Sequence, residues 1–432
     1  MSDKNAFGAG SPRKFYFMLT FWGAEFREHF YSLLLPTLLA PGNIPVLKDR
    51  PGSKLIICTT NEDWDALMGR PLMRQLAEYV EPLPLFIGYP GKDVPPQLHM
   101  SSGHQIAARR AYDDGAIAGF LAPDLLCSDG LIKSAVEFIE SGKKAVVCPA
   151  LRFNMEKVLK RINDAGLLKA GQAAALPAPF MGSVAANSLH PEILRYDFDG
   201  PEFDDYPIWS FWRVPGRDGL ILYTASWALL LADYAAIPRY VDDTLKNDTI
   251  DSHYVWSNFG HLRATDQVAL LNDSSQGTFI SLTPENAFDF AFHNRRARSL
   301  NALFYSLGLG RAKRTSEISR FYYDRNLDPW RKWLYTMPII LHGDTVDSDY
   351  EQCLLRSRAL MESAFRSRER WQNKAVGTVF SAAPYASRLT FRAFHFARRA
   401  LHVFSFGLIY YPGSSGKLLS AAVRRFSTKW PG

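Results

Sequence analysis

Residues 116–124, AIAGFLAPD, form an uncharged and mostly apolar run that ends at the carboxylate of Asp124. A continuous apolar run of this length is typical of a strand that is buried on both faces, as the strands of a parallel sheet are. A buried strand that ends on Asp delivers that side chain to the carboxyl edge of the sheet, where open α/β folds bind their ligands. The stretch therefore predicts an α/β fold and makes Asp124 the first candidate for chemistry.

The segments on either side of this stretch alternate between strand and helix patterns. Strands are predicted at 15–19, 54–60, 83–86, 116–122 and 144–149, and helices at 23–39, 71–79, 103–114 and 130–141. Such alternation builds a doubly wound, mostly parallel sheet with helices on its faces. We therefore predict a Rossmann-like α/β unit over residues 14–150.

The rhythm of the sequence changes after Arg152. Residues 155–200 are expected to be helical with an Ala-rich loop, and further short strands are predicted at 219–223, 268–271 and 278–282. No internal repeat and no long low-complexity linker separates these pieces. We expect a disordered N-terminus (1–13), a catalytic α/β domain (14–285) and a helical, basic and aromatic C-terminal region (286–432).

The composition of the 432 residues, with 47% hydrophobic and 22% charged side chains, is that of a packed globular protein. The first 14 residues carry no apolar stretch of the signal-peptide type, and no run reaches the roughly 18 apolar residues of a membrane span, so we expect a cytoplasmic protein. A net charge of +7 favours an anionic partner such as a nucleotide, a phospholipid surface or a nucleic acid. The four cysteines form no Cys-x-x-Cys pair and predict buried thiols in a reducing compartment: Cys58, Cys127, Cys148 and Cys353.

Three nucleotide and hydrolase signatures are absent from the sequence. No Gly-x-Gly-x-x-Gly follows the first strand, no Gly-x-x-x-x-Gly-Lys-Ser/Thr offers a P-loop, and no Gly-x-Ser-x-Gly forms a nucleophile elbow. The sequence therefore excludes the usual dinucleotide-binding, P-loop and α/β-hydrolase classes.

The predicted strand ends carry Thr20, Thr59 with Asn61, and Asp124, and Gly103-His104 opens the helix before the Asp124 strand. This order resembles the glycosyltransferases of the GT-A fold over roughly residues 14–285. The resemblance implies that the first two strand ends hold the base and ribose of a nucleotide sugar and that a carboxylate after a later strand holds a metal ion and the diphosphate. The family usually carries an Asp-x-Asp triplet there, whereas this chain has Ala122-Pro123-Asp124.

On this resemblance, Asp124 would hold Mg²⁺ or Mn²⁺ against a nucleoside diphosphate, because hard cations take oxygen ligands. The alternative is a strand-end Asp that caps the following turn. His104, with Arg109 on the same helix, would contribute to an anion site at the helix start, and the alternative is a packed or capping histidine. Asp129 is expected to be the N-cap of the helix that begins near Gly130.

A polar cluster lies in KNDTIDSHY, residues 246–254. Inverting glycosyl transfer needs a base that takes the proton of the acceptor hydroxyl, and Asp251 is the candidate, with His253 as its rival or as a metal ligand. The alternative is a solvated loop, in which Asn and Asp serve turn chemistry alone.

Aromatic residues gather between 209 and 227, where Trp209, Trp212 and Trp227 would offer ring faces to the C–H faces of an acceptor sugar. The alternative is core filling. Bulky apolar residues and arginines at helical spacing over 388–404 favour an interfacial helix on anionic lipid, and later basic residues extend the positive charge of the segment 388–430. The alternative is a helix packed on the catalytic body.

Three functional hypotheses follow. The first is a cytoplasmic glycosyltransferase, peripheral on the membrane through 388–430, that moves a sugar from a nucleotide-sugar donor to a glycan or lipid-linked acceptor in bacterial surface-polysaccharide or glycolipid synthesis. The second is a GT-A-like protein that binds a nucleotide or glycan without transfer activity. The third is a basic membrane-surface or nucleic-acid scaffold, although the basic and aromatic positions match no RNP-type or other nucleic-acid motif.

Overall fold

The computed structural model describes residues 13–366, apart from 202, 243, 244, 246–249, 251, 288–309 and 325. The chain divides into two compact units, Met1–Ser367 and Arg368–Gly432, and the described residues all belong to the first. The basic segment 388–430 and residues 1–12 of the predicted disordered N-terminus (1–13) lie outside the described residues.

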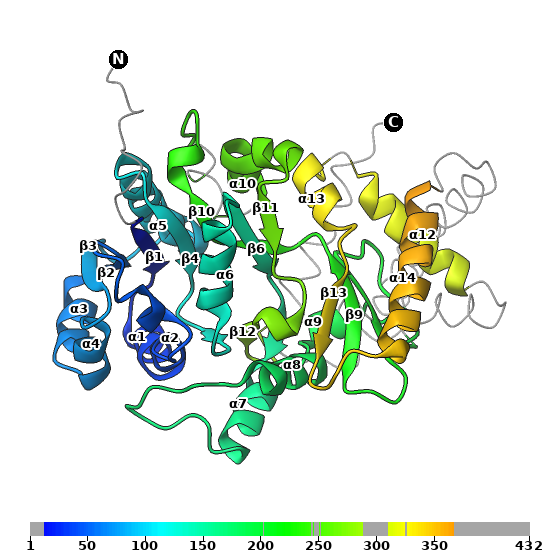
Figure 1. Ribbon diagram of the computed structural model, residues 1–432, viewed down its shortest axis with the longest axis horizontal. Helices are drawn as coiled ribbons and strands as arrows, with labels where there is room; N and C mark the ends of the chain where they lie inside the picture. Colours follow the sequence, from blue (N-terminus) through cyan, green and yellow to red (C-terminus); the bar gives the residue numbers. More distant parts are fainter. Residues whose placement is uncertain are drawn as a thin grey trace, which may run out of the picture. The chain divides into compact units, whose positions relative to one another are not determined.

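A seven-stranded sheet forms the centre of this unit, in the order β11-β6-β10-β4-β1-β2-β3 (Figure 1). Strands β1 to β4 run parallel, and β10 runs antiparallel to both β4 and β6, so β6 and its parallel neighbour β11 share the direction of β4. The predicted mostly parallel α/β sheet is therefore confirmed. The strands are β1 (Phe15–Thr20), β2 (Lys54–Thr59), β3 (Glu81–Phe86), β4 (Ile117–Leu121), β6 (Ala145–Pro149), β10 (Trp227–Asp233) and β11 (Val268–Leu270).

Two hydrophobic cores lie on the two faces of this sheet. All six residues of β1 are buried, and they alternate between the cores: Phe17 and Leu19 enter one, Tyr16 and Met18 the other. Burying one such side chain fully stabilises the fold by about 1.5–3 kcal/mol. Burial on both faces is why the central strands read as unbroken apolar runs.

Helices cover each face. One core includes residues of the π-helical turn η1 (Phe30–Leu34), α2 (Leu35–Leu38), α3 (Asn61–Met68), α4 (Pro71–Leu76) and α6 (Leu131–Glu140), and the exposed helix α1 (Ala24–His29) precedes η1. The other includes α5 (Pro96–Asp113), α7 (Met155–Asp164), α8 (Ala178–Asn187), α9 (Pro191–Leu194) and α10 (Ser252–Phe259). Figure 1 shows α6 lying over the sheet. The predicted helix at 103–114 exists, but it begins earlier than expected, at Pro96.

Strand β10 was not predicted from the sequence. A glycine on the neighbouring strand β4 allows β10 to pack beside it. A Cβ atom on Gly119 of β4 would lie 1.8 Å from the carbonyl oxygen of Leu230 in β10. Only a residue without a side chain allows the two strands to approach this closely. Gly119 therefore permits the antiparallel strand to separate β4 from β6.

The edge strand β3 carries its own protection against pairing with another chain. The N–H group of Glu81 donates to the carbonyl of Ser53 at 3.0 Å, and that of Ile87 donates to the carbonyl of Thr59 at 2.9 Å. The N–H groups at odd-numbered positions of β3 therefore point toward β2. The main-chain nitrogens at even-numbered positions point away from the sheet, and two of these positions are Pro82 and Pro84. Proline removes the N–H group that an added strand would need.

Two small sheets complete the unit. Strands β5 (Leu125–Cys127), β12 (Phe279–Thr283) and β7 (Arg152–Asn154) form one in that order, and β13 (Ile339–His342), β9 (Gly219–Thr224) and β8 (Trp209–Arg213) form the other. Strand β13 belongs to the region expected to be helical, which also contains α12 (Gly310–Tyr322), α13 (Pro329–Leu334) and α14 (Ser348–Arg366). The proposed domain boundary after residue 285 stays a prediction, and β13 pairs across it with β9.

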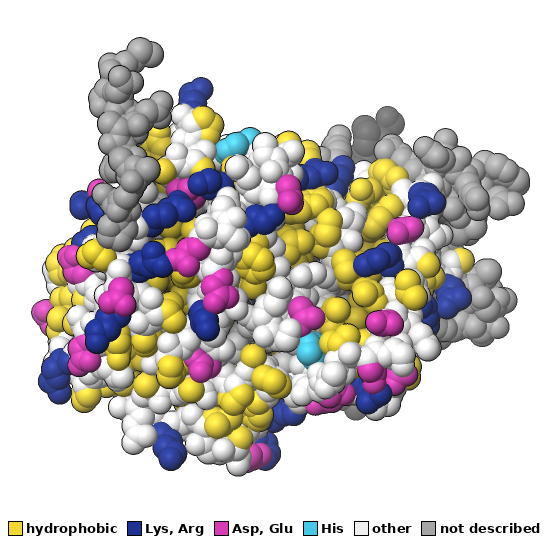
Figure 2. Space-filling model, viewed as in Figure 1, with side chains coloured by type: hydrophobic (Ala, Val, Ile, Leu, Met, Phe, Trp, Pro, Cys, Tyr) yellow, Lys and Arg dark blue, Asp and Glu magenta, His cyan; other side chains and the backbone are white. Residues whose placement is uncertain are grey.

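Within the described part of the chain, no helix combines the length and the apolar character that crossing a membrane requires. On the face drawn in Figure 2, cationic and anionic side chains are interspersed. The described residues on this face therefore do not gather the positive charge of the chain into one basic patch.

Candidate functional site

The carboxyl ends of the parallel strands lie at one edge of the central sheet. Thr20 ends β1, Thr59 ends β2, Asp124 follows β4, Pro149 ends β6, and Asn272 and Asp273 follow β11. This is the edge at which open α/β sheets bind ligands. It carries two groups of polar residues, one around Asp124 and one after β11.

Asp124 occupies a turn between β4 and β5, where its main-chain carbonyl accepts from the N–H of Leu282 at 3.0 Å. Its side chain is partly exposed. Burial raises the pKa of the carboxyl, and the positive charges offered by His29 and Arg152 act in the opposite direction. Asp124 therefore lies at the carboxyl edge of the sheet, within electrostatic range of Arg152 and His29.

These neighbours come from two other elements. Arg152 begins β7 and forms an ion pair with Glu192 at 2.9 Å, while half of its side chain remains accessible. His29 ends α1, its ring meets Phe26 at 5.8 Å, and its Nδ1 is buried without a partner. One carboxylate thus lies within electrostatic range of two side chains that can donate to an anion.

The predicted metal site has little support from the donor set. Among residues 13–366 as described, no group of three or more His, Cys, Asp or Glu side chains could hold a metal ion. A cage made of protein ligands alone is therefore not present there, and we derive no step through a metal. Binding of Mg²⁺ or Mn²⁺ by Asp124 together with a diphosphate stays a prediction.

The strand-end threonines do not face one another. Thr20 lies in register with Cys58, and both pack against Gly103 of α5, whose Cβ would lie 2.5 Å from the Thr20 hydroxyl. Thr59 follows Cys58 and so points to the opposite face. Both threonine hydroxyls are buried without a partner, and Asn61 is exposed at the start of α3.

His104 lies in the interior of α5, so the predicted anion site at a helix start is wrong. Helix α5 begins at Pro96, and the main-chain N–H of residue 104 therefore belongs to the helical hydrogen-bond ladder. The His104 ring is 6% exposed and meets Phe120 edge to face at 5.3 Å, with neither nitrogen partnered. Burial lowers the pKa of His104 to about 4, which keeps the ring neutral at pH 7.

Arg109 lies on the surface of α5, in the second half of the helix and far from its first turn. Its guanidinium pairs with Asp242 at 2.8 Å and lies over the ring of Tyr240 at 4.6 Å. These contacts account for the exposed guanidinium without a ligand.

The predicted base Asp251 lies outside the described residues. His253 is exposed on α10. The roles proposed for both residues stay predictions.

The predicted acceptor platform is wrong, because its rings are buried. Trp212 is fully buried and stacks on Phe198 at 4.8 Å, and Trp209 and Trp227 are 6% and 9% exposed. The indole N–H of Trp227 donates to the Thr224 carbonyl at 2.8 Å. Core filling, the alternative interpretation of these rings, describes all three.

Asp129 also differs from expectation. Its Oδ1 accepts from the N–H of Gly42 at 2.7 Å, and the N-cap of α6 is Gly130, with a φ of 89° and no side-chain cap. Asp129 therefore ties the loop after α2 to the start of α6 rather than capping the helix.

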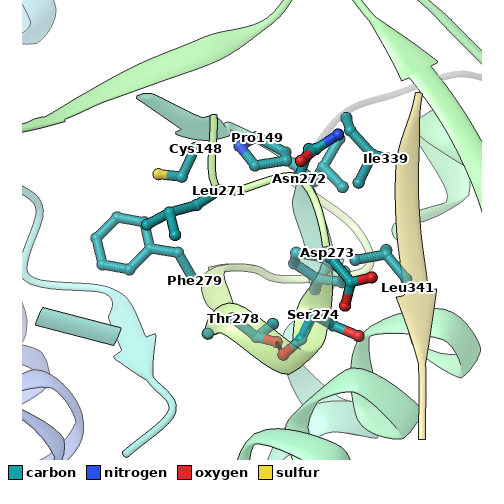
Figure 3. A pocket seen from close by; sticks show the side chains of 13 residues that line it. Cys148, Pro149, Leu271, Asn272, Asp273, Ser274, Thr278, Phe279, Ile339 and Leu341 are labelled. Atoms are coloured by element: carbon teal, nitrogen blue, oxygen red, sulfur yellow. Dashed lines mark hydrogen bonds between the residues drawn. The ribbon is translucent and has the colours of Figure 1, made fainter. Parts of the chain in front are cut away.

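The group of residues after β11 was missed by sequence reasoning. It lines a small, open pocket between the ends of β6 and β11, the start of β12, and β13, with room for about one water molecule. Figure 3 shows Cys148, Leu271 and Phe279 on one side of it, with Asn272, Asp273, Ser274 and Leu341 across from them.

Asp273 is the charged residue of this pocket, and three donors hold its Oδ1. These are the N–H and the hydroxyl of Ser275, at 2.8 and 2.6 Å, and Nε2 of His342, at 2.9 Å. Burial opposes the charged form, but these hydrogen bonds outweigh it and lower the pKa of Asp273. The carboxylate is therefore charged at neutral pH.

The surroundings of His342 favour its charged form. Its Nδ1 lies against the carbonyl of Asp344 and its Nε2 lies 2.9 Å from the Asp273 carboxylate, so both ring nitrogens face acceptors, which a doubly protonated ring satisfies. The hydrogen bond to Asp273 raises the pKa of His342, and burial opposes that rise. With both nitrogens occupied, His342 orients Asp273 and is not itself a free base.

The sequence contained one signal for this group. Asn272-Asp273-Ser274 follows the predicted strand 268–271, which is the same arrangement of an acidic residue after a strand that singled out Asp124. His342 had no such signal, because β13 comes from the region that was expected to be helical.

The fold and its carboxyl edge define a class: a mixed α/β protein with a mostly parallel seven-stranded sheet and polar side chains gathered at the ligand-binding edge. The chain matches no protein-family model and no curated protein. Solved structures that it resembles in part include a glucose-1-phosphate thymidylyltransferase from Bacillus anthracis in complex with a sucrose, and the apo form of mouse xyloside xylosyltransferase 1.

Both likenesses are partial. The first has 13% identity and a TM-score of 0.21 and covers 34% of this chain and 57% of the other. The second has 12% identity and a TM-score of 0.21 and covers 37% and 60%. The chain thus spans less than two thirds of the length of either protein.

Proposed function

We propose that this protein is a glycosyltransferase that moves a sugar from a nucleotide-sugar donor to a glycan or lipid-linked acceptor. The observation that carries the proposal is the composition of the edge at Asp124: one partly exposed carboxylate that feels the electrostatic influence of two side chains, His29 and Arg152, that can donate to an anion. A nucleotide sugar offers hydroxyl groups, which donate to a carboxylate, and phosphate oxygens, which accept from Arg and His.

In this proposal Asp124 accepts from ribose or sugar hydroxyls, and Arg152 and His29 neutralise the phosphates. Thr20, Thr59 and Asn61 stay candidates for the donor site, and the hydroxyls of the two threonines have no hydrogen-bond partner in the described structure. Asp251 remains the candidate for the base that takes the proton of the acceptor hydroxyl, with His253 beside it in the sequence. Contact with an anionic membrane through 388–430 would bring the enzyme to a lipid-linked acceptor.

A thermal-shift panel tests the proposal. UDP-, GDP-, CDP- and CMP-linked ligands are each added with and without Mn²⁺, because a ligand that binds only the folded state raises the melting temperature. We expect one nucleotide class to stabilise the wild type and to lose most of its effect in Asp124→Asn. Comparison of the two arms measures whether the ligand needs the metal.

Asp113→Asn is the matched control, since Asp113 is an exposed carboxylate at the end of α5 that precedes β4, at the opposite edge of the sheet. It should leave the shift unchanged. The absence of a shift with every nucleotide, or an equal shift in Asp124→Asn, would contradict a donor site at Asp124.

A further inference from the structure

Helix α12 buries charged side chains against the loop that precedes β8, residues 195–208. Lys313, Arg314 and Glu317 are 8%, 5% and 1% exposed. The guanidinium of Arg314 donates to the carbonyl of Gly200 in the loop. The helix is therefore docked on the loop through charged groups, and taking such groups out of water has a cost that their partners must offset.

The loop meets α12 through a strained residue. Tyr206 has a φ of 61°, in the left-handed region that bulky residues rarely adopt. Its ring lies edge to face against Phe321 of α12 at 4.8 Å. A strained conformation persists where the surrounding contacts hold it. The shape of the loop and the docked position of α12 therefore depend on each other.

Glu317 receives no hydrogen bond from the loop. Both of its carboxylate oxygens accept from one nitrogen of Arg320, at 3.0 and 2.8 Å, and Arg320 belongs to the same helix. Across the interface, the described part of the loop offers Glu317 the like charge of Asp205 instead of a donor. The charge of Glu317 is thus buried, faces a second carboxylate and is paired only within α12.

The other charged groups around α12 come from α12 itself and from α14, which pack against each other. Lys313 favours the charged form of Glu317 and lies 3.8 Å from Asp205. Helix α14 meets α12 through apolar contacts such as that of Phe365 with Tyr322 at 4.2 Å. The charged residues of α14 between 356 and 366 have other neighbours: Arg356 pairs with Asp199, Arg358 lies near Tyr223, and Glu362 pairs with Arg366.

These surroundings make the docking of α12 depend on a proton. Burial and the charge of Asp205 outweigh Arg320 and Lys313, and they raise the pKa of Glu317 from 4.5 to about 7. When α12 leaves the loop, water reaches the carboxyl and its pKa returns toward 4.5. The docked state therefore binds the proton more tightly. By linkage, docking weakens as the pH rises between these two values and stays weak above the higher one.

We infer that α12 and the loop before β8 form a pH-sensitive latch, which is closed while Glu317 is protonated and loosened when Glu317 is charged opposite Asp205. Opening uncovers Ile318 and Phe321, which are buried in the docked helix. The inference goes beyond the proposed function. It requires neither a nucleotide nor a sugar, so it is tested separately from the donor site.

Hydrogen–deuterium exchange on the full-length protein at pH 6 and pH 8.5 tests the latch. The exchange rate, corrected for the intrinsic effect of pH, reports the local opening of each segment. With a docked pKa of about 7 for Glu317, the opening equilibrium of peptides from α12 should rise about tenfold between these pH values. Glu317→Gln has nearly the same shape and takes no charge, so it should abolish the rise.

Glu137→Gln is the matched control, because this side chain of α6 is 62% exposed. It should keep the wild-type rise in α12, and peptides from α6 should show no rise in any of the proteins. Asp205→Asn is a second variant, for the case in which Glu317→Gln does not fold. It removes the like charge from a side chain that is 49% exposed and should reduce the rise.

Three results would overturn the inference. The first is a corrected exchange of α12 that is equal at both pH values in the wild type. The second is a rise of the same size in the wild type, Glu317→Gln and Asp205→Asn, which would assign the pH dependence to another group. The third is an equal rise in α6, which would indicate global opening. A nucleotide shift that depends on Asp124 can accompany any of them, so rejection of the latch leaves the proposed function intact.

Discussion

His104 and His342 are both buried, yet their surroundings drive their protonation in opposite directions. His104 packs against Phe120 and its ring nitrogens have no hydrogen-bond partner in the described structure, so burial favours its neutral form. His342 faces the Asp273 carboxylate and the Asp344 carbonyl, so its charged form is held. Each histidine therefore makes stability depend on pH in its own range.

We expect the free energy of unfolding of His104→Phe to fall less than that of the wild type as the pH is lowered. In the unfolded chain a histidine takes up a proton below about pH 6.5, whereas folded His104 does so only near pH 4. Stability therefore falls as the pH drops between these values, by up to about 3 kcal/mol from this residue alone. Urea unfolding at pH 7, 5.5 and 4.5 measures the slope.

The variant should also be at least as stable as wild type at pH 7, since a buried polar group without a partner costs about 1–3 kcal/mol. His261→Phe, at an exposed position, is the control and should keep the wild-type slope. A slope in His104→Phe equal to that of wild type would mean that His104 finds a partner in solution.

We expect His342→Gln to lower stability most on the acid side of neutrality. The folded pKa of His342 is raised, so its contribution is complete below the unfolded value of about 6.5 and is lost as the pH rises through the folded pKa. The contribution of Asp273, whose pKa is lowered, is present above about pH 3.8 and is lost as the pH falls through its folded value. The pair is thus complete between the two folded pKa values.

A charge-assisted hydrogen bond of this kind is worth about 1–2 kcal/mol. The free energy of unfolding of His342→Gln should therefore fall by that amount at pH 5.5 and by less at pH 9, with His261→Gln as the exposed control. An equal loss at both pH values would show that His342 acts by packing rather than by charge.

Strand β10 is the element that sets the arrangement of the sheet, because it runs against its neighbours between β4 and β6. Its approach depends on the missing side chain of Gly119, which lies against the Leu230 carbonyl. The position of β10 in the sheet therefore depends on Gly119 of the neighbouring strand as well as on the apolar sequence of β10 itself.

Gly119→Ala should destabilise the protein by about 3 kcal/mol or more, since its Cβ would stand 1.8 Å from a main-chain oxygen that has no room to move. Soluble yield and the midpoint of urea unfolding measure the effect. Gly69→Ala is the matched control, because no atom lies within 4 Å of its added Cβ and its φ is negative. A Gly119→Ala protein as stable as the control would contradict the close approach of β10 to β4.

At the scale of the whole molecule, the region after residue 285 contributes to the folded unit. Strand β13 pairs with β9, and α8 passes so close to β13 that a Cβ on Gly182 would lie 1.9 Å from the His342 carbonyl. The Asp273 pocket takes one of its walls from β13. A sequence-based boundary at 285 would cut through this packing.

We expect a chain that ends at Ser367 to fold cooperatively and a chain that ends at residue 285 to lose cooperative unfolding or solubility. The shorter chain exposes the β9 edge and the surface covered by α14, whose buried residues include Cys353 and Met361. Differential scanning calorimetry of both truncations gives the answer. Cooperative unfolding of both chains would instead support the boundary at 285.

The class of the fold was accessible from the sequence because it depends on local patterns. Apolar runs bounded by polar turns located β1, β2, β4 and β6, and the spacing of helices between them required a mostly parallel sheet. The position of Asp124 at the end of an apolar run identified it as a candidate site residue. These signals are carried by neighbours in sequence, since burial on both faces of a strand imposes its composition directly.

Only the tertiary structure decided which side chains meet. Trp209 and Trp212 are as aromatic as a sugar platform would be, and only the packing of β8 against β9 shows that they are interior. Asp273 and His342 are 69 residues apart, and nothing local to either predicts the pair. A site built from distant segments depends on strand order and on close approaches such as that at Gly119, and these follow from packing between elements rather than from the sequence within any one of them.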